Sequence, residues 1–188
     1  MSPMVRAPLT LEYALLGYIR QRSMYGYELH QLLTQPSGLG LVWQIKQSQL
    51  YALLDKLEKD GFLSVTLAES QNNRPSRKFF NLTPAGEQAF LAWLRQPVKQ
   101  ARGIRQEFLA KLYFSLSEDG ATASALVHTQ LETCRTWNAS LEEELASRRG
   151  SPGFDEWVTR FRLQQVRGIC AWLAELEESI DWDRGEGD

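Results

Sequence analysis

The spacing of apolar residues changes partway along this chain, and that change constrains the fold more than any other feature. Before Asp60 the apolar residues recur every three or four positions, as on one face of a helix. From Phe62 onward they alternate with polar or small residues, as in a half-buried strand, with Leu63, Val65 and Leu67 on one face. The change from helical spacing to alternating spacing of apolar residues therefore predicts a group of helices followed by strands.

Three helices are expected before the change. The first covers Thr10 to Arg22, the second ends before Pro36, and the third covers Gln47 to Asp60, with Gly61 as its stop. The third helix has a predicted buried stripe made of Leu50, Leu53, Leu54 and Leu57. The residues predicted to face outward from it are Gln47, Gln49, Ala52, Lys56 and Lys59.

A β-hairpin and a fourth helix follow. The second strand is predicted from Lys78 to Leu82, and the polar stretch from Glu69 to Arg77 is typical of a hairpin tip rather than a helix. Thr83 and Pro84 are a favoured start for a helix, because Thr accepts from free amide groups and Pro fits the first helical position.

Residues 101–188 show helical patterns only. We expect helices at 104–116, 120–148 and 154–180, and a frayed tail from Arg184. The apolar stripes of the last two are longer than a lone fold of this size needs to bury, which favours a helical bundle or a dimer. The fold class is therefore mainly α with a small β-hairpin, divided into domains at residues 1–100 and 101–188.

Three helices, a hairpin and another helix are the order of a winged helix-turn-helix, whose third helix enters the DNA major groove. The N-terminal end of that helix can reach base edges, and its positive dipole favours phosphate. The candidate DNA-binding residues here are Tyr25, Lys46, Gln47, Ser48, Gln49, Tyr51 and Lys56, with Tyr51 and Lys56 as phosphate contacts. An ordinary solvated helix face is the alternative interpretation.

The hairpin tip, or wing, is rich in hydrogen-bond donors. The candidate DNA-binding residues in it are Asn73, Arg74, Arg77 and Lys78. Residues 1–100 also carry more Lys and Arg than Asp and Glu, whereas residues 101–188 carry an acidic excess. That asymmetry favours contact between the first half and a polyanion. A plain soluble hairpin is the alternative.

Residues 10–95 resemble the PadR family of transcriptional regulators. Four stretches carry the resemblance: Leu15 to Ile19, Met24 to Leu29, Gln49 to Leu63, and Arg77 to Gly86. This chain has Lys46 and Ala52 where the family usually has a Ser or Thr and the Pro of a Tyr-Pro pair.

The resemblance implies a homodimer, usually a repressor, bound to double-stranded DNA at an inverted-repeat operator. Residues 101–180 are similar to the helical dimerisation domain of the longer family members. In some members a small aromatic effector releases the DNA, so tryptophans are candidate ligand contacts. The candidates are Trp43, Trp93 and Trp137. Core or interface packing is the alternative for most of them.

Several function classes lack support in the sequence. His30 and His128 have no partners at metal-ligand spacing, Cys134 and Cys170 suit a buried core, and no catalytic motif is present. We expect no enzyme, no cofactor, no metal, no membrane span and a cytoplasmic protein. A winged-helix protein-interaction module without DNA binding and a small-molecule carrier remain open as alternative functions.

Overall fold

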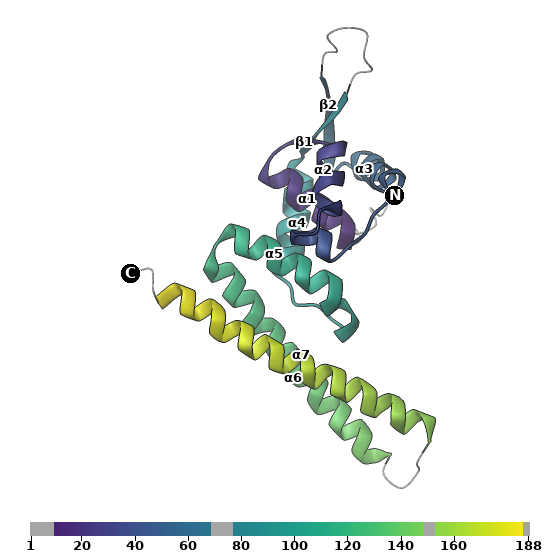
Figure 1. Ribbon diagram of the computed structural model, residues 1–188, viewed down its shortest axis with the longest axis vertical. Helices are drawn as coiled ribbons and strands as arrows, with labels where there is room; N and C mark the ends of the chain where they lie inside the picture. Colours follow the sequence, from purple (N-terminus) through teal and green to yellow (C-terminus); the bar gives the residue numbers. More distant parts are fainter. Residues whose placement is uncertain (1–9, 69–76, 149–152, 186–188) are drawn as a thin grey trace, which may run out of the picture. The chain divides into compact units, whose positions relative to one another are not determined.

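The computed structural model describes residues 10–68, 77–148 and 153–185 (Figure 1). Packing divides the chain into two compact units. We call Met1–Arg95 with Leu109–Phe114 the N-terminal unit, and Gln96–Phe108 with Ser115–Asp188 the C-terminal unit. The expected boundary at residue 100 stays a prediction about folding domains, but packing assigns part of a later helix to the first unit.

The N-terminal unit contains four helices of the expected type. They are α1 (Thr10–Gln21), α2 (Gly26–Thr34), α3 (Gln47–Lys59) and α4 (Pro84–Leu94), with a short 3-10 helix at Gly38–Leu41. The hydroxyl of Thr83 accepts from the backbone N–H of Gly86 at 3.1 Å, so the predicted start of α4 is confirmed.

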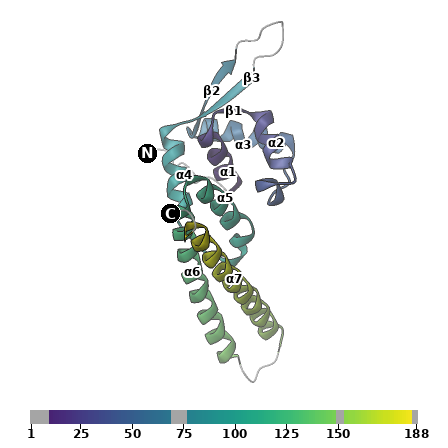
Figure 2. The same cartoon turned by 60° about the vertical axis from the view of Figure 1, so that its left-hand side comes forward.

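The sheet has one strand more than the sequence predicts. Strands β2 (Leu63–Ala68) and β3 (Arg77–Leu82) pair antiparallel, and β1 (Met24–Tyr25) pairs with the other edge of β3 (Figure 2). Phe80 lies opposite both Val65 and Met24. A two-residue strand is too short to show alternation, so the spacing of apolar residues could not predict β1.

The core of the N-terminal unit lies beneath α3 and the sheet. Leu50, Leu54 and Leu57 are buried as predicted, whereas Leu53 is only half-buried against the core. Helix α5 (Leu109–Glu118) contributes Phe114 to this core, and its ring occupies the space above Gly17 of α1. A Cβ at Gly17 would stand 2.6 Å from the ring, so a side chain there has no room.

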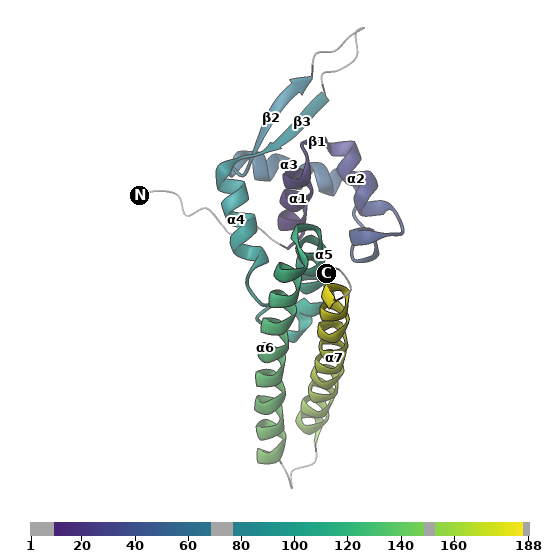
Figure 3. The ribbon, with the colours of Figure 1, turned by 90° about the vertical axis from the view of Figure 1, so that its left-hand side faces the viewer.

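From Ala101 onward the described part of the C-terminal unit is mainly helical. A 3-10 turn (Ala101–Gly103) and a π-helical turn (Ile104–Phe108) lead into α5, where the sequence predicted one continuous helix from residue 104. Helices α6 (Gly120–Ser147) and α7 (Phe154–Gly185) then lie antiparallel, side by side (Figure 3). Helix α7 continues to Gly185, beyond the predicted end at residue 180.

Both cysteines have the expected core setting. Cys134 is fully buried on α6 and Cys170 is half-buried on α7. Burial raises the pKa of the Cys134 thiol to about 12, so this thiol is neutral at physiological pH. Among the described residues, no helix is both long enough and apolar enough to span a membrane, and no cluster of metal-ligating side chains occurs.

Candidate nucleic-acid interface

The first turn of α3 presents a row of polar side chains to solvent. Lys46 precedes the helix in an extended conformation, and Gln47, Ser48 and Gln49 follow it, all exposed. Leu50 lies fully buried directly after them, which fixes the rotation of the helix about its axis. The turn contains no acidic side chain, so its amide groups and Lys46 can approach an anion without repulsion.

Tyr51 is held by the start of α2. A Cβ built at Gly26 would stand 2.7 Å from Tyr51 Cε1 and 3.1 Å from its hydroxyl oxygen. The ring therefore packs closely over the backbone of Gly26 and is half-buried. Glycine at this position permits the close approach, which sets the direction of the Tyr51 hydroxyl.

Tyr25 belongs to an aromatic group at the base of the wing. Its ring stacks on Tyr27 at 5.8 Å between centroids and tilts against Phe79, its partner across β1 and β3, at 5.0 Å. The ring of Tyr27 is 42% exposed, and the Arg77 guanidinium carbon lies 5.8 Å from its centroid. Tyr27 was not among the residues predicted from the sequence, although it is the second tyrosine of the Tyr25-Gly26-Tyr27 run.

Glu28 holds the junction of β1 and α2, which carries Tyr25 and Tyr27, by hydrogen bonds. Its carboxylate accepts from the backbone N–H of Tyr25 at 2.7 Å and from Arg22 Nη1 at 3.0 Å. These two donors hold the pKa of Glu28 below its ordinary value. The junction of β1 and α2, which carries Tyr25 and Tyr27, is thus hydrogen-bonded in place.

The side chain of Lys56 is 37% exposed, and it also has carboxylate partners within the protein. Its Nζ donates to Glu12 Oε1 at 2.6 Å and lies 3.7 Å from Asp60 Oδ2. Glu12 is completely buried on α1. A buried carboxylate is stabilised by a cation, so Lys56 joins α3 to α1, and the expected phosphate contact stays a prediction.

Lys78 also has partners within the protein. Its Nζ donates to Asp55 Oδ1 at 2.8 Å and to Glu58 Oε2 at 3.1 Å. These hydrogen bonds, first that of Asp55, raise the pKa of Lys78 above its ordinary value. Lys78 on β3 is therefore bound to two carboxylates of α3, and its DNA contact stays a prediction.

The remaining wing residues divide into described and undescribed positions. Arg77 is exposed at the start of β3, next to Tyr27. Asn73 and Arg74 lie outside the described residues, so their DNA contacts stay predictions.

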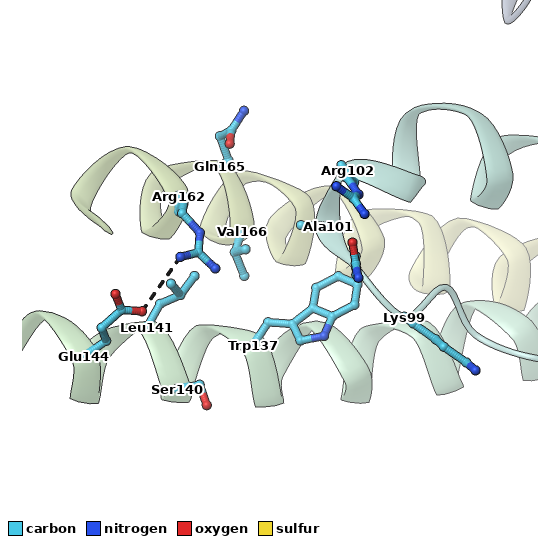
Figure 4. Close-up of a pocket in the computed structure, with 11 residues that line it drawn as sticks. Lys99, Ala101, Arg102, Trp137, Ser140, Leu141, Glu144, Arg162, Gln165 and Val166 are labelled. Atoms are coloured by element: carbon cyan, nitrogen blue, oxygen red, sulfur yellow. Dashed lines mark ion pairs between the residues drawn. The ribbon is translucent and has the colours of Figure 1, made fainter. Parts of the chain in front are cut away.

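The three candidate ligand-binding tryptophans have different environments. Trp93 is 8% exposed, stacks on Tyr13 at 4.8 Å and lies 5.1 Å from Lys111 Nζ, so it fills the N-terminal core. Trp43 packs against that core beside a cavity of about 490 Å³. Trp137 lines a cavity of about 760 Å³ within the C-terminal unit (Figure 4).

Comparison with known proteins relates part of this chain to a family. Residues 15–92 match the model of the transcriptional regulator PadR-like family. The negative transcriptional regulator PadR of Bacillus subtilis (strain 168) is 29% identical over 184 residues, covering 92% of this chain and 98% of that protein.

Solved structures of the Bacillus subtilis protein are also similar to this chain. Its crystal structure in complex with operator DNA is 27% identical, with 92% of this chain and 99% of that chain covered and a TM-score of 0.46. Its complex with p-coumaric acid is 26% identical, with the same coverage and a TM-score of 0.41.

Proposed function

This chain carries a PadR-like domain over residues 15–92, and on that premise we propose that it is a homodimeric repressor that binds double-stranded DNA. The observation that carries the proposal is the first turn of α3, where Lys46, Gln47, Ser48 and Gln49 are exposed above a buried apolar face. A rigid helix with outward polar side chains at its N-terminal end is what reading base edges requires. Repression is supported by the name of the Bacillus subtilis relative, a negative transcriptional regulator.

The proposed contacts follow from side-chain chemistry. The amide groups of Gln47 and Gln49 offer both donors and acceptors, which suits adenine in the major groove. Lys46 and the amide groups of the first turn suit phosphate, and Arg77 beside Tyr27 suits the backbone or the minor groove. A DNA-binding regulator must share a compartment with its operator, so we propose a cytoplasmic location. We propose no enzymatic activity for this protein.

The partner that we propose for dimerisation is a second copy of this chain. Phe154, Trp157, Val158 and Phe161 form a stripe along one face of α7, spaced three and four residues apart, and we call it the α7 stripe. Phe154, Trp157 and Phe161 are 80%, 71% and 62% exposed. A continuous apolar face of this kind marks an interaction surface, and an inverted-repeat operator requires a two-fold symmetric protein.

DNA binding is tested by fluorescence anisotropy with the DNA upstream of the protein's own gene. The titration uses two salt concentrations and a scrambled competitor. We expect specific binding by two chains per site. A Gln47→Ala, Gln49→Ala variant should lose discrimination against the scrambled sequence, by about 1–3 kcal/mol for each lost base contact.

The matched control is Gln88→Ala, an exposed glutamine on α4 outside the proposed interface. It should bind as the unmodified protein does. Equal affinity of the unmodified protein for specific and scrambled DNA, whatever the salt, would contradict the proposal. Together with binding of a protein partner through α3, that result would favour a winged-helix interaction module.

A further inference from the structure

We propose that Cys134 and Cys170 are a redox-sensitive modification site, at which a hydroperoxide converts the two thiols into a disulfide. They are the two cysteines of the chain, and the fold places one on α6 and the other on the antiparallel α7 (Figure 3). Both lie in the C-terminal unit. Formation of the disulfide is independent of the function proposed above, and only an effect of it on DNA binding would rest on that function.

Contacts on either side of the two cysteines fix the register of α6 against α7. Nearer the start of α6, His128 Nδ1 lies 2.8 Å from Glu177 Oε1 of α7. Nearer its end, Arg167 Nη2 of α7 donates to Glu142 Oε1 at 2.9 Å. Because the helices are antiparallel, the residues between these contacts on one helix face those between them on the other. The two cysteines lie in these intervals.

The two sulfur atoms are in contact and are held there by their surroundings. The Cys134 thiol donates a hydrogen bond to the Cys170 sulfur. Gln130 Nε2, fully buried, lies 4.0 Å from Cys134 Sγ, and Cys170 packs against the apolar cluster around Leu163. Sulfur atoms already in hydrogen-bond contact can reach the disulfide bond length of about 2.05 Å by adjustment of the two side chains.

The difference in exposure assigns the order in which the thiols react. Cys170 is half-buried, so a molecule as small as hydrogen peroxide can reach it, whereas Cys134 is fully buried. Burial raises the pKa of Cys170 above its ordinary value, but the hydrogen bond from Cys134 and the charge of Arg135 oppose that rise. The thiolate of Cys170 therefore reacts first, and Cys134 supplies the second sulfur.

The reaction has two steps, with hydrogen peroxide as the oxidant. The Cys170 thiolate attacks one peroxide oxygen, the O–O bond breaks, and a sulfenic acid forms, while the departing hydroxide takes up the proton that Cys170 released. Cys134 then attacks the sulfenic sulfur, the S–S bond forms, the S–O bond breaks, and the Cys134 proton leaves with that oxygen as water. Two thiols thus give two electrons to one peroxide, with one disulfide and two waters as products.

The test treats the reduced full chain with hydrogen peroxide and then counts thiols under denaturing conditions. We expect both thiols to be lost, the intact mass to fall by that of two hydrogen atoms, and a digest to contain the Cys134 peptide joined to the Cys170 peptide. The product should run as a single chain on a non-reducing denaturing gel. Its urea midpoint should rise, because the cross-link restricts the unfolded chain, and dithiothreitol should restore the thiols and the original midpoint.

Two alanine variants test the order of reaction. Cys134→Ala should stop at the Cys170 sulfenic acid, which dimedone traps, and peroxide should no longer raise its urea midpoint. Cys170→Ala should keep Cys134 as a thiol for as long as the unmodified protein takes to oxidise completely, because a buried thiol is unreactive.

N-acetylcysteine in the same peroxide solution is the control for the oxidant. Survival of both protein thiols while N-acetylcysteine is oxidised would overturn the inference. A disulfide between two chains, in place of one within a chain, would overturn it as well. Because no DNA enters these measurements, their failure is separate from failure of the proposed DNA binding, which the anisotropy assay measures.

Discussion

At the scale of single residues, two lysines, one on α3 and one on β3, have carboxylate partners that the sequence did not predict. Lys56 was predicted to contact phosphate and Lys78 to contact DNA, and both donate to carboxylates within the N-terminal unit. Their roles are therefore to hold elements together and to neutralise acids near the proposed DNA surface. Each role has a measurable consequence.

For Lys78, we predict that Lys78→Gln weakens DNA binding without changing its salt dependence. The substitution leaves Asp55 and Glu58 uncompensated on the exposed side of α3, where they repel phosphates. A residue in direct contact with a phosphate instead contributes roughly 0.9 to the slope of log K against log salt. Anisotropy titrations at several salt concentrations measure the slope.

Asp55→Asn with Glu58→Gln is the complementary variant for this prediction. It removes the two acids and releases Lys78, so DNA affinity should increase. A slope reduced by about one unit in Lys78→Gln would show that Lys78 contacts phosphate in the complex.

For Lys56, we predict a loss of stability from Lys56→Met, because buried Glu12 then loses its 2.6 Å hydrogen bond from Lys56 Nζ. Removing one partner of a fully buried pair costs about 3–5 kcal/mol. The loss here should be lower, roughly 2–3 kcal/mol, because the Lys56 side chain is 37% exposed. Urea unfolding measures it. The double variant Glu12→Gln, Lys56→Met should recover most of the loss, whereas additive losses would mean that the two side chains act independently.

At the scale of elements, close approaches between helices determine which side chains can replace a glycine on α1. Phe114 of α5 occupies the space above Gly17, and this contact brings the first part of α5 into the N-terminal unit. Gly168 of α7, in contrast, has nothing within 4 Å of the position of a Cβ. The same substitution should therefore act in opposite directions at these two helical glycines.

We predict that Gly17→Ala destabilises the protein by about 1–3 kcal/mol through overpacking against Phe114. Gly168→Ala should stabilise it by roughly 0.5–1 kcal/mol, because alanine restricts the unfolded chain and suits a helix interior. Urea midpoints of the two variants make the comparison. Equal shifts at both positions would mean that the core around Phe114 adjusts freely.

At the scale of the whole molecule, the proposed DNA binding depends on assembly. One copy of the chain offers one α3 and one wing, whereas an inverted repeat has two half-sites. The α7 stripe is the surface that we propose for joining two copies. Its exposed rings would otherwise remain in water, at a cost proportional to their apolar area.

We predict that Phe161→Glu shifts the protein from dimer to monomer, because a buried, unpaired charge at the interface weakens association by at least roughly 100-fold. Sedimentation equilibrium measures the mass. Gln88→Glu, with the same added charge at an exposed position of α4 in the N-terminal unit, should remain dimeric. If Phe161→Glu stays dimeric, another surface joins the two copies.

Much of the architecture was determined by local patterns in the sequence. The three- and four-residue spacing predicted the helices of both halves, the alternation after Phe62 predicted β2 and β3, and Thr83-Pro84 predicted the start of α4. The exposed row from Lys46 to Gln49 also followed from the sequence, because burial of Leu50 and Leu54 sets the face of α3. These features depend on neighbours a few residues apart, and a sequence displays such neighbours directly.

Other features were decided only by tertiary structure. Glu12 lies 44 residues before Lys56, Asp55 lies 23 before Lys78, and Phe114 meets Gly17 from a distant helix. Likewise, the pairing of β1 with β3 and the cavity around Trp137 bring together segments that no short period connects. The helical pattern alone predicts a solvent-exposed lysine, because it does not show the carboxylate that the fold places next to it. Long-range packing therefore determined which cations hold the protein together.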